Sequence, residues 1–317
     1  MTDAALYLGM LGSGQLASGL ALDRHKAEAA LQAVAEQLGA TVRETAIGVI
    51  KIVCAGMANA IREITIERGV DPRGLKLLSF GGAGPMLATQ VARELEMDSV
   101  IVPPYAGNFS AWGLLGSDLI RSTARTRLFH LSDDELEVLD VVVDEMFQEL
   151  EQHGDDSHFR KASTRELSLS LRFTGQEHSL TIPVALCNGR RSPSATELAA
   201  AFRDAYLRSF GAVLNSGVEI IGLRARLRKP LPRTARRQSE KLGASTAKDH
   251  TENHGLHSFA AGNQVAGRTL QRASLRAGER HAGPAIIYEE TATTYVDADF
   301  TYGVDEHGCL HLKRGRE

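Results

Sequence analysis

Three glycines and a proline stand directly behind a short apolar run in LLSFGGAGPMLA, residues 77–88. The apolar residues predict a buried strand and the residues after the proline predict a helix, so Gly81, Gly82 and Gly84 form the turn between them. Such a turn brings backbone amides and the positive end of a helix dipole up to a phosphate or a nucleotide. Leu87 stands where a dinucleotide fingerprint needs its third glycine, so that motif is excluded. A nucleotide-binding turn and a tight structural turn both remain open.

The stretch HTENHGLH supplies a second set of residues with possible chemistry, His250, His254 and His257. They lie in a polar segment without periodicity, where nothing fixes ligand geometry or supplies hydrogen bonds behind the imidazoles. We therefore expect exposed loop histidines and no metal site. Cys54 falls on an apolar helix face, which predicts a small buried hydrophobe rather than a nucleophile.

The composition limits the classes of partner. The chain has 317 residues, which is room for about two domains, and its formal net charge of -3 gives no electrostatic footprint for nucleic acid. No uninterrupted apolar run approaches the ~18 residues of a membrane span, so no membrane partner is expected. The three cysteines are far apart in sequence and odd in number, which indicates a reducing cytoplasm.

Around the glycine turn, the pattern predicts a parallel α/β unit, because strand, helix and strand follow one another. A loop-like segment comes first, two helices follow, and a loop leading into a short helix ends the region. The expected ranges are a loop at 3–22, helices at 24–38 and 42–68, a strand at 75–80, a helix at 85–95, a strand at 99–102 and the final loop at 103–118.

After residue 125 the pattern changes to α+β. Alternating apolar residues at 167–173 and 180–184 predict a hairpin, and capping boxes at 132–135 and 194–197 predict a helix on each side of it. A strand near 218–227 closes this region. The polar, aperiodic segment 231–266 reads as a linker or mobile loop, and the tail reads as a small β element.

Longer sequence motifs are more specific than the hydrophobic pattern. TDAALYLGML near the N-terminus, MANAIREITIERGVDPRGLKLLSFGGAGP, VIVPPYAGNFSAWGLLGSD, LRFTGQEHSLTIP and GPAIIYEETATTYV run through nearly the whole chain. In these motifs the chain resembles the C-terminal portion of the hydantoinase A / 5-oxoprolinase family, which also includes acetone carboxylase-type subunits.

The resemblance implies a fold and a domain order. Residues 1–125 would be the second half of an actin-like ATPase domain, the α/β fold of acetate and sugar kinases, actin and heat-shock chaperones. Residues 126–230 would be the family's C-terminal α+β domain, residues 231–266 a linker, and residues 267–317 a small β element of that C-terminal domain.

The resemblance also implies a site and a reaction. Gly81, Gly82 and Gly84 would be the adenosine motif, with Asn108 and Ser110 at the head of a short helix lining the same cleft. The family uses ATP and Mg²⁺ to phosphorylate a cyclic amide such as hydantoin or 5-oxoproline, after which a hydantoinase B-type partner subunit or domain completes ring opening. Some members act on a ketone instead, so a fragment of a ketone carboxylase subunit is an alternative.

The chain departs from the family pattern in ways that bear on activity. Leu87 replaces a histidine and Ala5 an asparagine, and the sequence contains no D-x-G-G-T loop to hold the β- and γ-phosphates. We therefore expect a truncated subunit that lacks the N-terminal ATPase portion and does not turn over ATP alone. No catalytic residue can be named from the sequence. A non-catalytic remnant or assembly subunit that pairs with a partner chain is the competing interpretation.

Overall fold

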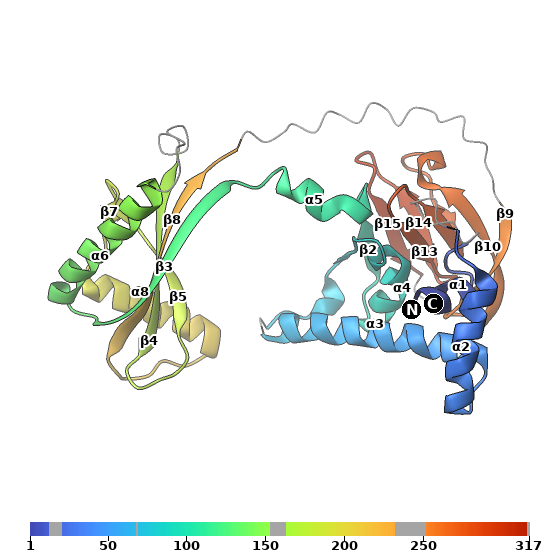
Figure 1. Cartoon of the computed structure of the whole chain (residues 1–317), viewed down its shortest axis with the longest axis horizontal. Coiled ribbons are helices and arrows are strands. Elements are labelled where there is room, and N and C mark those ends of the chain that lie inside the picture. Colours follow the sequence, from blue (N-terminus) through green and yellow to red (C-terminus); the bar gives the residue numbers. More distant parts are fainter. Residues whose placement is uncertain (13–20, 68, 153–162, 232–251, 316–317) are drawn as a thin grey trace. The chain divides into compact units, whose positions relative to one another are not determined.

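A computed structural model describes residues 1–12, 21–67, 69–152, 163–231 and 252–315 (Figure 1). The chain forms two compact units. Unit 1 combines Met1–Leu114 with Ala235–Glu317, and unit 2 is Leu115–Thr234.

Helices of unit 1 come from its first segment. They are α1 (Thr2–Tyr7), α2 (Arg24–Leu38), α3 (Val42–Glu67), α4 (Gly84–Glu94), α5 (Phe109–Leu114) and the 3-10 turns η1 (Pro72–Gly74) and η2 (Ala106–Asn108). The Asp23 side chain caps α2 by accepting from the backbone amides of His25 and Lys26, and Gly39 ends the helix in the left-handed region at φ 64°. The helix predicted at 24–38 is confirmed.

The loop predicted at 3–22 is wrong at its start, because Thr2–Tyr7 form helix α1. Scattered glycines suggested a loop, whereas Ala4, Ala5 and Leu6 are buried and the helix packs against α2 and α3. Tertiary burial has therefore overridden a weak local signal. Residues 13–20 of the predicted loop lie outside the described residues.

Helix α3 packs on the core through one face, which differs in part from the expected apolar stripe, because Met57 and Ile64 of that stripe are exposed. Ile50, Cys54 and Ala58 are fully or almost fully buried in the core of unit 1. Over an 18-residue window α3 is also long and apolar enough, by length and composition, to cross a membrane, although only 28% of that window is buried. The sequence analysis considered only uninterrupted apolar runs and did not identify this helix. A few polar residues interrupt α3, although its mean hydropathy is high.

Two sheets share the core of unit 1. The first has the order β1-β2-β15-β14-β11 and the second β13-β12-β10-β9. Their strands are β1 (Leu77–Leu78), β2 (Ser99–Val102), β9 (Glu252–Ser258), β10 (Asn263–Gln271), β11 (His281–Ala282), β12 (Ala285–Tyr288), β13 (Thr293–Val296), β14 (Phe300–Val304) and β15 (Leu310–Arg314), with the 3-10 turn η3 (Arg272–Ser274) after β10. The pair β1 and β2 is parallel around α4, as the strand, helix and strand pattern predicted.

The C-terminal segment packs on the first segment of unit 1. Residues 267–317 were expected to be a small β element of the family's C-terminal domain, and in the structure β15 pairs antiparallel with β2, aligning Leu312 with Val100. Both side chains are completely buried. The segment belongs to unit 1, because it extends the sheet that carries the glycine turn. Local patterns contain no information on a pairing between residues more than 200 positions apart.

The predicted linker 231–266 also needs correction over the residues that the structure describes. Strand β9 and the start of β10 occupy its second half and pair antiparallel with each other, aligning His257 with Gln264. The polar sequence hid this strand, because polar side chains at its positions broke the apolar alternation. Residues 232–251 of the predicted linker lie outside the described residues.

Unit 2 is an antiparallel sheet of order β3-β8-β4-β5 with two helices packed on it (Figure 1). Its elements are β3 (Leu119–His130), α6 (Asp133–Gln152), β4 (Thr164–Phe173), β5 (Leu180–Val184), β6 (Leu186–Cys187), β7 (Arg190–Arg191), α8 (Ala195–Phe210) and β8 (Val218–Lys229). Alternate residues of β4 are buried, so both helices cover one face of the sheet. The capping box Ser194 and Glu197 begins α8 as predicted. Strand β3, which begins directly after the loop predicted at 103–118, was not foreseen.

Candidate functional site

The glycine turn and the segment after β2 meet at one end of the parallel strand pair. The backbone amide of Ser79 donates to the carbonyl of Ile101 at 2.8 Å, which extends the β1–β2 pairing. Two residues on, the amide of Gly81 donates to the carbonyl of Ala106 at 2.7 Å. The carboxyl ends of parallel strands are where α/β sheets bind ligands. All five residues proposed from the sequence lie in these two segments.

The three glycines have different structural roles. Gly81 has φ 90°, a conformation that favours glycine, and its amide is already used in the bond to Ala106. A Cβ on Gly84 would lie 3.2 Å from the Ser79 hydroxyl, so this glycine allows close packing at the start of α4. A Cβ on Gly82 would meet no atom within 4 Å, and Gly82 is exposed. Gly82 is therefore the position where a ligand can lie against the backbone.

Helix α4 begins at this turn with its N-terminus uncapped by a side chain. Ala83 occupies the N-cap position and Pro85 the first turn. Leu87, where the resemblance predicts a histidine, is 2% exposed and packs in the core of unit 1, so an apolar side chain lies among apolar neighbours.

Asn108 and Ser110 lie across from the glycines on η2 and α5, and both are exposed. Within the described residues, neither side chain makes a hydrogen bond, so both remain available to a ligand. Tyr105 precedes them in the left-handed region at φ 57° and is 67% exposed. A non-glycine residue held in this conformation stores backbone strain, which is typical of binding loops.

An aromatic cluster borders the glycine turn, and the sequence reading missed it. The rings of Phe80 and Phe109 are 5.2 Å apart, and Phe109 stacks on Trp112 at 5.6 Å with an interplanar angle of 19°. Phe80 and Trp112 are 43% and 52% exposed. Half-exposed stacked rings beside an open glycine offer a platform for a planar base. The signal was present in FGGAGP and NFSAW, where an aromatic residue flanks each loop.

Arg272 and Glu289 from the C-terminal segment brace the loop after β2. Their side chains form an ion pair and each is 9% exposed. The Arg272 guanidinium also donates to the carbonyls of Val102 at 2.7 Å and Pro103 at 3.0 Å, directly before the Tyr105 turn. A buried guanidinium with several fixed acceptors holds a loop rigidly, since each bond restricts the same planar group.

A buried polar network fixes the far end of α4. Asp297 is completely buried and pairs with Arg93 at 2.8 Å, and the Gln90 amide also donates to it at 2.9 Å. The Ser258 hydroxyl donates to the same carboxylate at 2.6 Å. Burial raises the pKa of Asp297, but the hydrogen bonds from Ser258 and Arg93 outweigh it and leave the pKa below its usual value. Asp297 is thus a structural carboxylate that joins α4 to the second sheet.

The other sequence candidates have structural roles. His257 was expected in an exposed loop but is 3% exposed in β9, with its Nδ1 3.3 Å from the Arg43 guanidinium. Burial and Arg43 lower its pKa, which keeps the ring neutral. The prediction for Cys54 is confirmed, since burial and Glu94 raise the pKa of its thiol to about 11. His250 lies outside the described residues. No cluster of three or more His, Cys, Asp or Glu side chains with metal-binding geometry occurs in the part of the chain that the structure describes.

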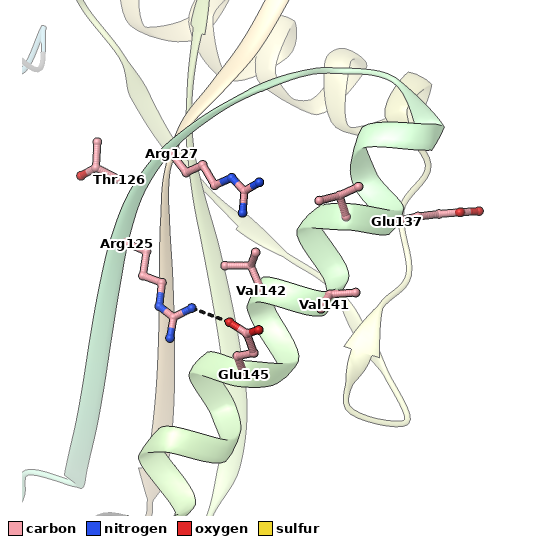
Figure 2. A pocket seen from close by; sticks show the side chains of 8 residues that line it. Arg125, Thr126, Arg127, Glu137, Val141, Val142 and Glu145 are labelled. Carbon is pink, nitrogen blue, oxygen red and sulfur yellow. Dashed lines mark hydrogen bonds and ion pairs between the residues drawn. The ribbon is translucent and has the colours of Figure 1, made fainter.

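Unit 2 has a groove of its own, of about 680 Å³, between β3 and α6 (Figure 2). Arg125 points across it to Glu145 and forms an ion pair at 2.8 Å, while Val141 and Val142 face it from α6. The lining combines the paired Arg125 with Arg127, whose guanidinium lies 5.0 Å from the centre of the Phe129 ring, and with an apolar face of α6. None of the site residues proposed from the sequence lines this groove.

Sequence profiles of known families account for almost the whole chain. The profile described as hydantoinase/oxoprolinase matches residues 1–123, and the profile of the hydantoinase/oxoprolinase C-terminal domain matches residues 131–315. The chain belongs to the hydantoinase/oxoprolinase family. The resemblance read from the motifs is thereby confirmed.

Two enzyme subunits are similar to this chain over almost its whole length. The caprolactamase subunit alpha of Pseudomonas jessenii is 30% identical over 99% of the chain and 46% of the relative. The acetone carboxylase beta subunit of Xanthobacter autotrophicus is 26% identical over the same shares. The crystal structure of the ATP-dependent caprolactamase matches 99% of the chain with a TM-score of 0.74 at 26% identity, and 46% of that structure is covered. The chain spans about half the length of these relatives.

Proposed function

We propose that this chain supplies the nucleoside-binding half of an ATP site in a hydantoinase/oxoprolinase subunit with an actin-like ATPase domain. The observation that carries the proposal is the meeting of the glycine turn with the 105–110 loop at the carboxyl ends of β1 and β2, tied by Gly81 and Ala106. Open space over Gly82 and the aromatic platform beside it fit a nucleoside.

The residues present divide the work of holding the nucleotide. Gly82 admits the nucleoside against the backbone, Trp112 and Phe80 stack on the base, and Asn108 and Ser110 hydrogen-bond the sugar. Bound ATP, with Mg²⁺, would supply a phosphoryl group that activates a carbonyl oxygen. No D-x-G-G-T loop is present in the sequence to hold the terminal phosphates, so phosphoryl transfer needs a complementing ATPase portion.

The substrate class we propose is a cyclic amide of the hydantoin or 5-oxoproline type. Caprolactamase, the relative named above at 30% identity, supports an amide. The acetone carboxylase relative at 26% identity makes a ketone the competing substrate. Both relatives are named as subunits, which supports a partner subunit, of the hydantoinase B type, that completes the reaction after activation.

Intrinsic fluorescence tests the nucleoside half directly, because Trp112 is the only tryptophan in the chain. Adenosine, AMP and ATP should each quench it with similar, millimolar dissociation constants. The three should be similar because the chain contacts only the part of the ligand that they share. Micromolar binding of ATP with weak binding of adenosine would contradict the assignment of a half-site.

A glycine pair provides the matched variants. Gly82→Val places a branched side chain in the open approach and should abolish quenching without unfolding the protein, since no atom lies within 4 Å of its Cβ position. Gly74→Val, in the 3-10 turn before β1, also has open space around its Cβ position and should leave quenching unchanged. Equal affinity in both variants would place the nucleoside elsewhere.

Turnover separates the enzymatic interpretation from that of an assembly subunit. A coupled ATPase assay with 5-oxoproline, hydantoin or acetone should show no turnover by this chain alone. Turnover should return with the complementing ATPase portion and be stimulated by a cyclic amide. Stimulation by acetone alone would favour a ketone carboxylase, and nucleotide binding without any stimulation would favour a non-catalytic role.

A further inference from the structure

The edge strand of the unit 2 sheet is long and borders the groove shown in Figure 2. Strand β3 is the outermost strand in the order β3-β8-β4-β5, so its outer backbone edge pairs with no other strand among the described residues. It has 12 residues, about twice the length of a typical strand. An edge of this length presents a continuous row of backbone donors and acceptors to another chain.

One side of the groove is an apolar patch on helix α6. Val138 and Val141 are 47% and 60% exposed, and Val142 lies beside them and is almost buried. All three valines line the groove. Val138 is three positions from Val141 and four from Val142, so their side chains form one continuous patch on the helix. This patch suits apolar side chains of a segment that lies in the groove.

The β3 side of the groove carries two arginines, of which one is already paired. Arg125 reaches across to Glu145 at 2.8 Å. Arg127 forms no ion pair with any residue that the structure describes, and its guanidinium lies over the Phe129 ring, 5.0 Å from the ring centre. A guanidinium stacked on a ring keeps its in-plane N–H donors available. Figure 2 shows Glu137, another carboxylate of the lining, directed away from Arg127, so Arg127 is open to an external carboxylate.

We propose that the groove between β3 and α6 binds an extended polypeptide segment, which pairs with the β3 edge as an added strand. Successive side chains of a strand point to opposite faces, so every second side chain of the segment enters the groove. Apolar side chains there pack on Val138 and Val141, and a carboxylate in line with them pairs with Arg127. Strand addition with pockets for alternate side chains is a general mode of peptide recognition. The inference concerns unit 2 and does not rest on the nucleoside half-site.

The charge of the edge favours an acidic segment over a second copy of this chain. Arg121, Arg125 and Arg127 follow one another along β3, and the strand contains no carboxylate. Antiparallel pairing with the β3 strand of a second copy would bring these arginines close to one another, and like charges on facing strands are destabilising. The occupant is therefore a segment of a partner polypeptide with apolar residues at alternate positions and a carboxylate beside them.

Selection from a random peptide library tests the proposal on the full chain. Nonapeptides displayed on phage are selected against the wild-type chain and against the Arg127→Glu variant. The wild-type chain should enrich peptides with apolar residues at alternate positions and a neighbouring Asp or Glu, and the variant should not enrich them. Absence of this pattern, or the same pattern with both proteins, overturns the proposal.

Fluorescence anisotropy with one selected peptide, labelled with fluorescein, locates the binding surface. Arg127→Glu and Val141→Glu should each raise the Kd about tenfold or more. Arg224→Glu and Val213→Glu are the matched controls and should leave the Kd unchanged. Arg224 is exposed on the interior strand β8, Val213 is 39% exposed in the loop after α8, and neither lines the groove. Equal weakening by a control variant and its groove counterpart overturns the proposal.

N-methylation of the selected peptide tests the strand pairing itself. An added strand directs the amides of every second residue toward β3, so N-methylation should raise the Kd about tenfold at alternate positions and little at the positions between them. The same effect at every position, or at none, would show binding without strand pairing and overturns the proposal. Sedimentation of the chain alone completes the test, since a dimer that Val141→Glu dissociates would make a second copy the occupant and also overturns it.

Discussion

Unit 2 is built from one continuous segment, whereas unit 1 is assembled from two segments separated by the whole of unit 2. In unit 2 each β-strand pairs with a strand close in sequence or with β8, and its core is one layer between a sheet and two helices. In unit 1 the first segment supplies the glycine turn and helices, and the second supplies most of the strands. The proposed site lies in the unit with the less local construction.

The two segments of unit 1 are joined by polar contacts as well as by the core. The Tyr288 hydroxyl donates to the carbonyl of Leu11 at 2.8 Å, and the amide of His257 donates to the carbonyl of Leu8 at 2.8 Å. A Cβ on Gly107 would lie 2.2 Å from the carbonyl oxygen of Thr291, so the loop of the proposed site touches the second segment directly. The difference between the units teaches that the proposed site needs the C-terminal strands to hold its shape.

Removal of residues 232–317 should have the largest effect and should act on one unit. Strand β2 would lose β15, and apolar core residues of the first segment would be exposed, so unit 1 should not fold. Unit 2 should keep its own cooperative transition. Calorimetry and hydrogen exchange on the shortened chain measure both, and retained protection of α4 would show that the first segment folds without its partner.

Asp297→Asn should destabilise unit 1 by about 3 kcal/mol, since it removes the completely buried carboxylate of the network and leaves the partly buried Arg93 guanidinium with Asp299 as its remaining ion-pair partner. Urea unfolding followed by Trp112 fluorescence reports on unit 1. Asp204→Asn in unit 2 is the control, because its pair with Arg208 is exposed and should matter by less than about 0.5 kcal/mol. Equal effects of the two variants would remove the distinction between a buried network and a surface pair.

Acid should weaken unit 1 in two steps. The pKa of His257 is lowered in the fold, so its contribution is present above the ordinary value of about 6.5 and is lost as the pH falls through the folded pKa. The pKa of Asp297 is lowered too, so its contribution is lost only below about pH 4. Unfolding free energies measured against pH should lose the first step in His257→Gln and the second in Asp297→Asn. A first step that persists in His257→Gln would assign it to another group.

Phe202→Leu should destabilise unit 2 alone, by about 1.5 kcal/mol. Phe202 is fully buried, and its ring lies 5.0 Å from that of Phe173 in an edge-on arrangement that leucine cannot reproduce. Hydrogen exchange of β4 should accelerate while that of α4 stays unchanged. Faster exchange in both would indicate that the units unfold together.

Among these variants, Trp112→Leu should have the smallest effect on the free energy of unfolding. Its main effect should be weaker adenosine binding. The side chain is half exposed, so its loss should cost unit 1 less than about 1 kcal/mol, whereas loss of stacking should weaken adenosine binding about tenfold. Calorimetric titration measures the affinity without the tryptophan signal. Trp112→Phe should recover much of it, and wild-type affinity in Trp112→Leu would remove the platform from the site.

The sequence was sufficient where structure is local. Gly39 located the end of α2 and the capping box at Ser194 located the start of α8, because each signal acts within one turn of the helix. It was insufficient for β3, whose burial pattern is nearly all exposed or intermediate, and for the pairing of β15 with β2. A strand with no buried face gives no alternation, and a pairing across 200 residues gives no local pattern at all.

In the proposed site, too, local features could be predicted from the sequence and long-range contacts could not. The glycines and the 108–110 loop could be identified because their residue types are constrained by backbone geometry. The roles of the individual glycines could not, since they depend on Ala106 and Ser79 at specific distances. The contact of Arg272 with the loop after β2 could not be predicted either, because the residues around Arg272 in the sequence give no sign of a contact with that distant loop.

The ends of unit 2 give the chain a modular organisation. Leu119, near the start of unit 2, is aligned with Lys229, near its end, on the adjacent antiparallel strands β3 and β8. Paired residues on such strands lie about 5 Å apart, so the chain enters and leaves unit 2 at neighbouring positions. Unit 2 is therefore an insertion that can be excised: a short glycine-serine bridge from residue 118 to residue 230 should leave a minimal domain that retains the proposed nucleoside half-site.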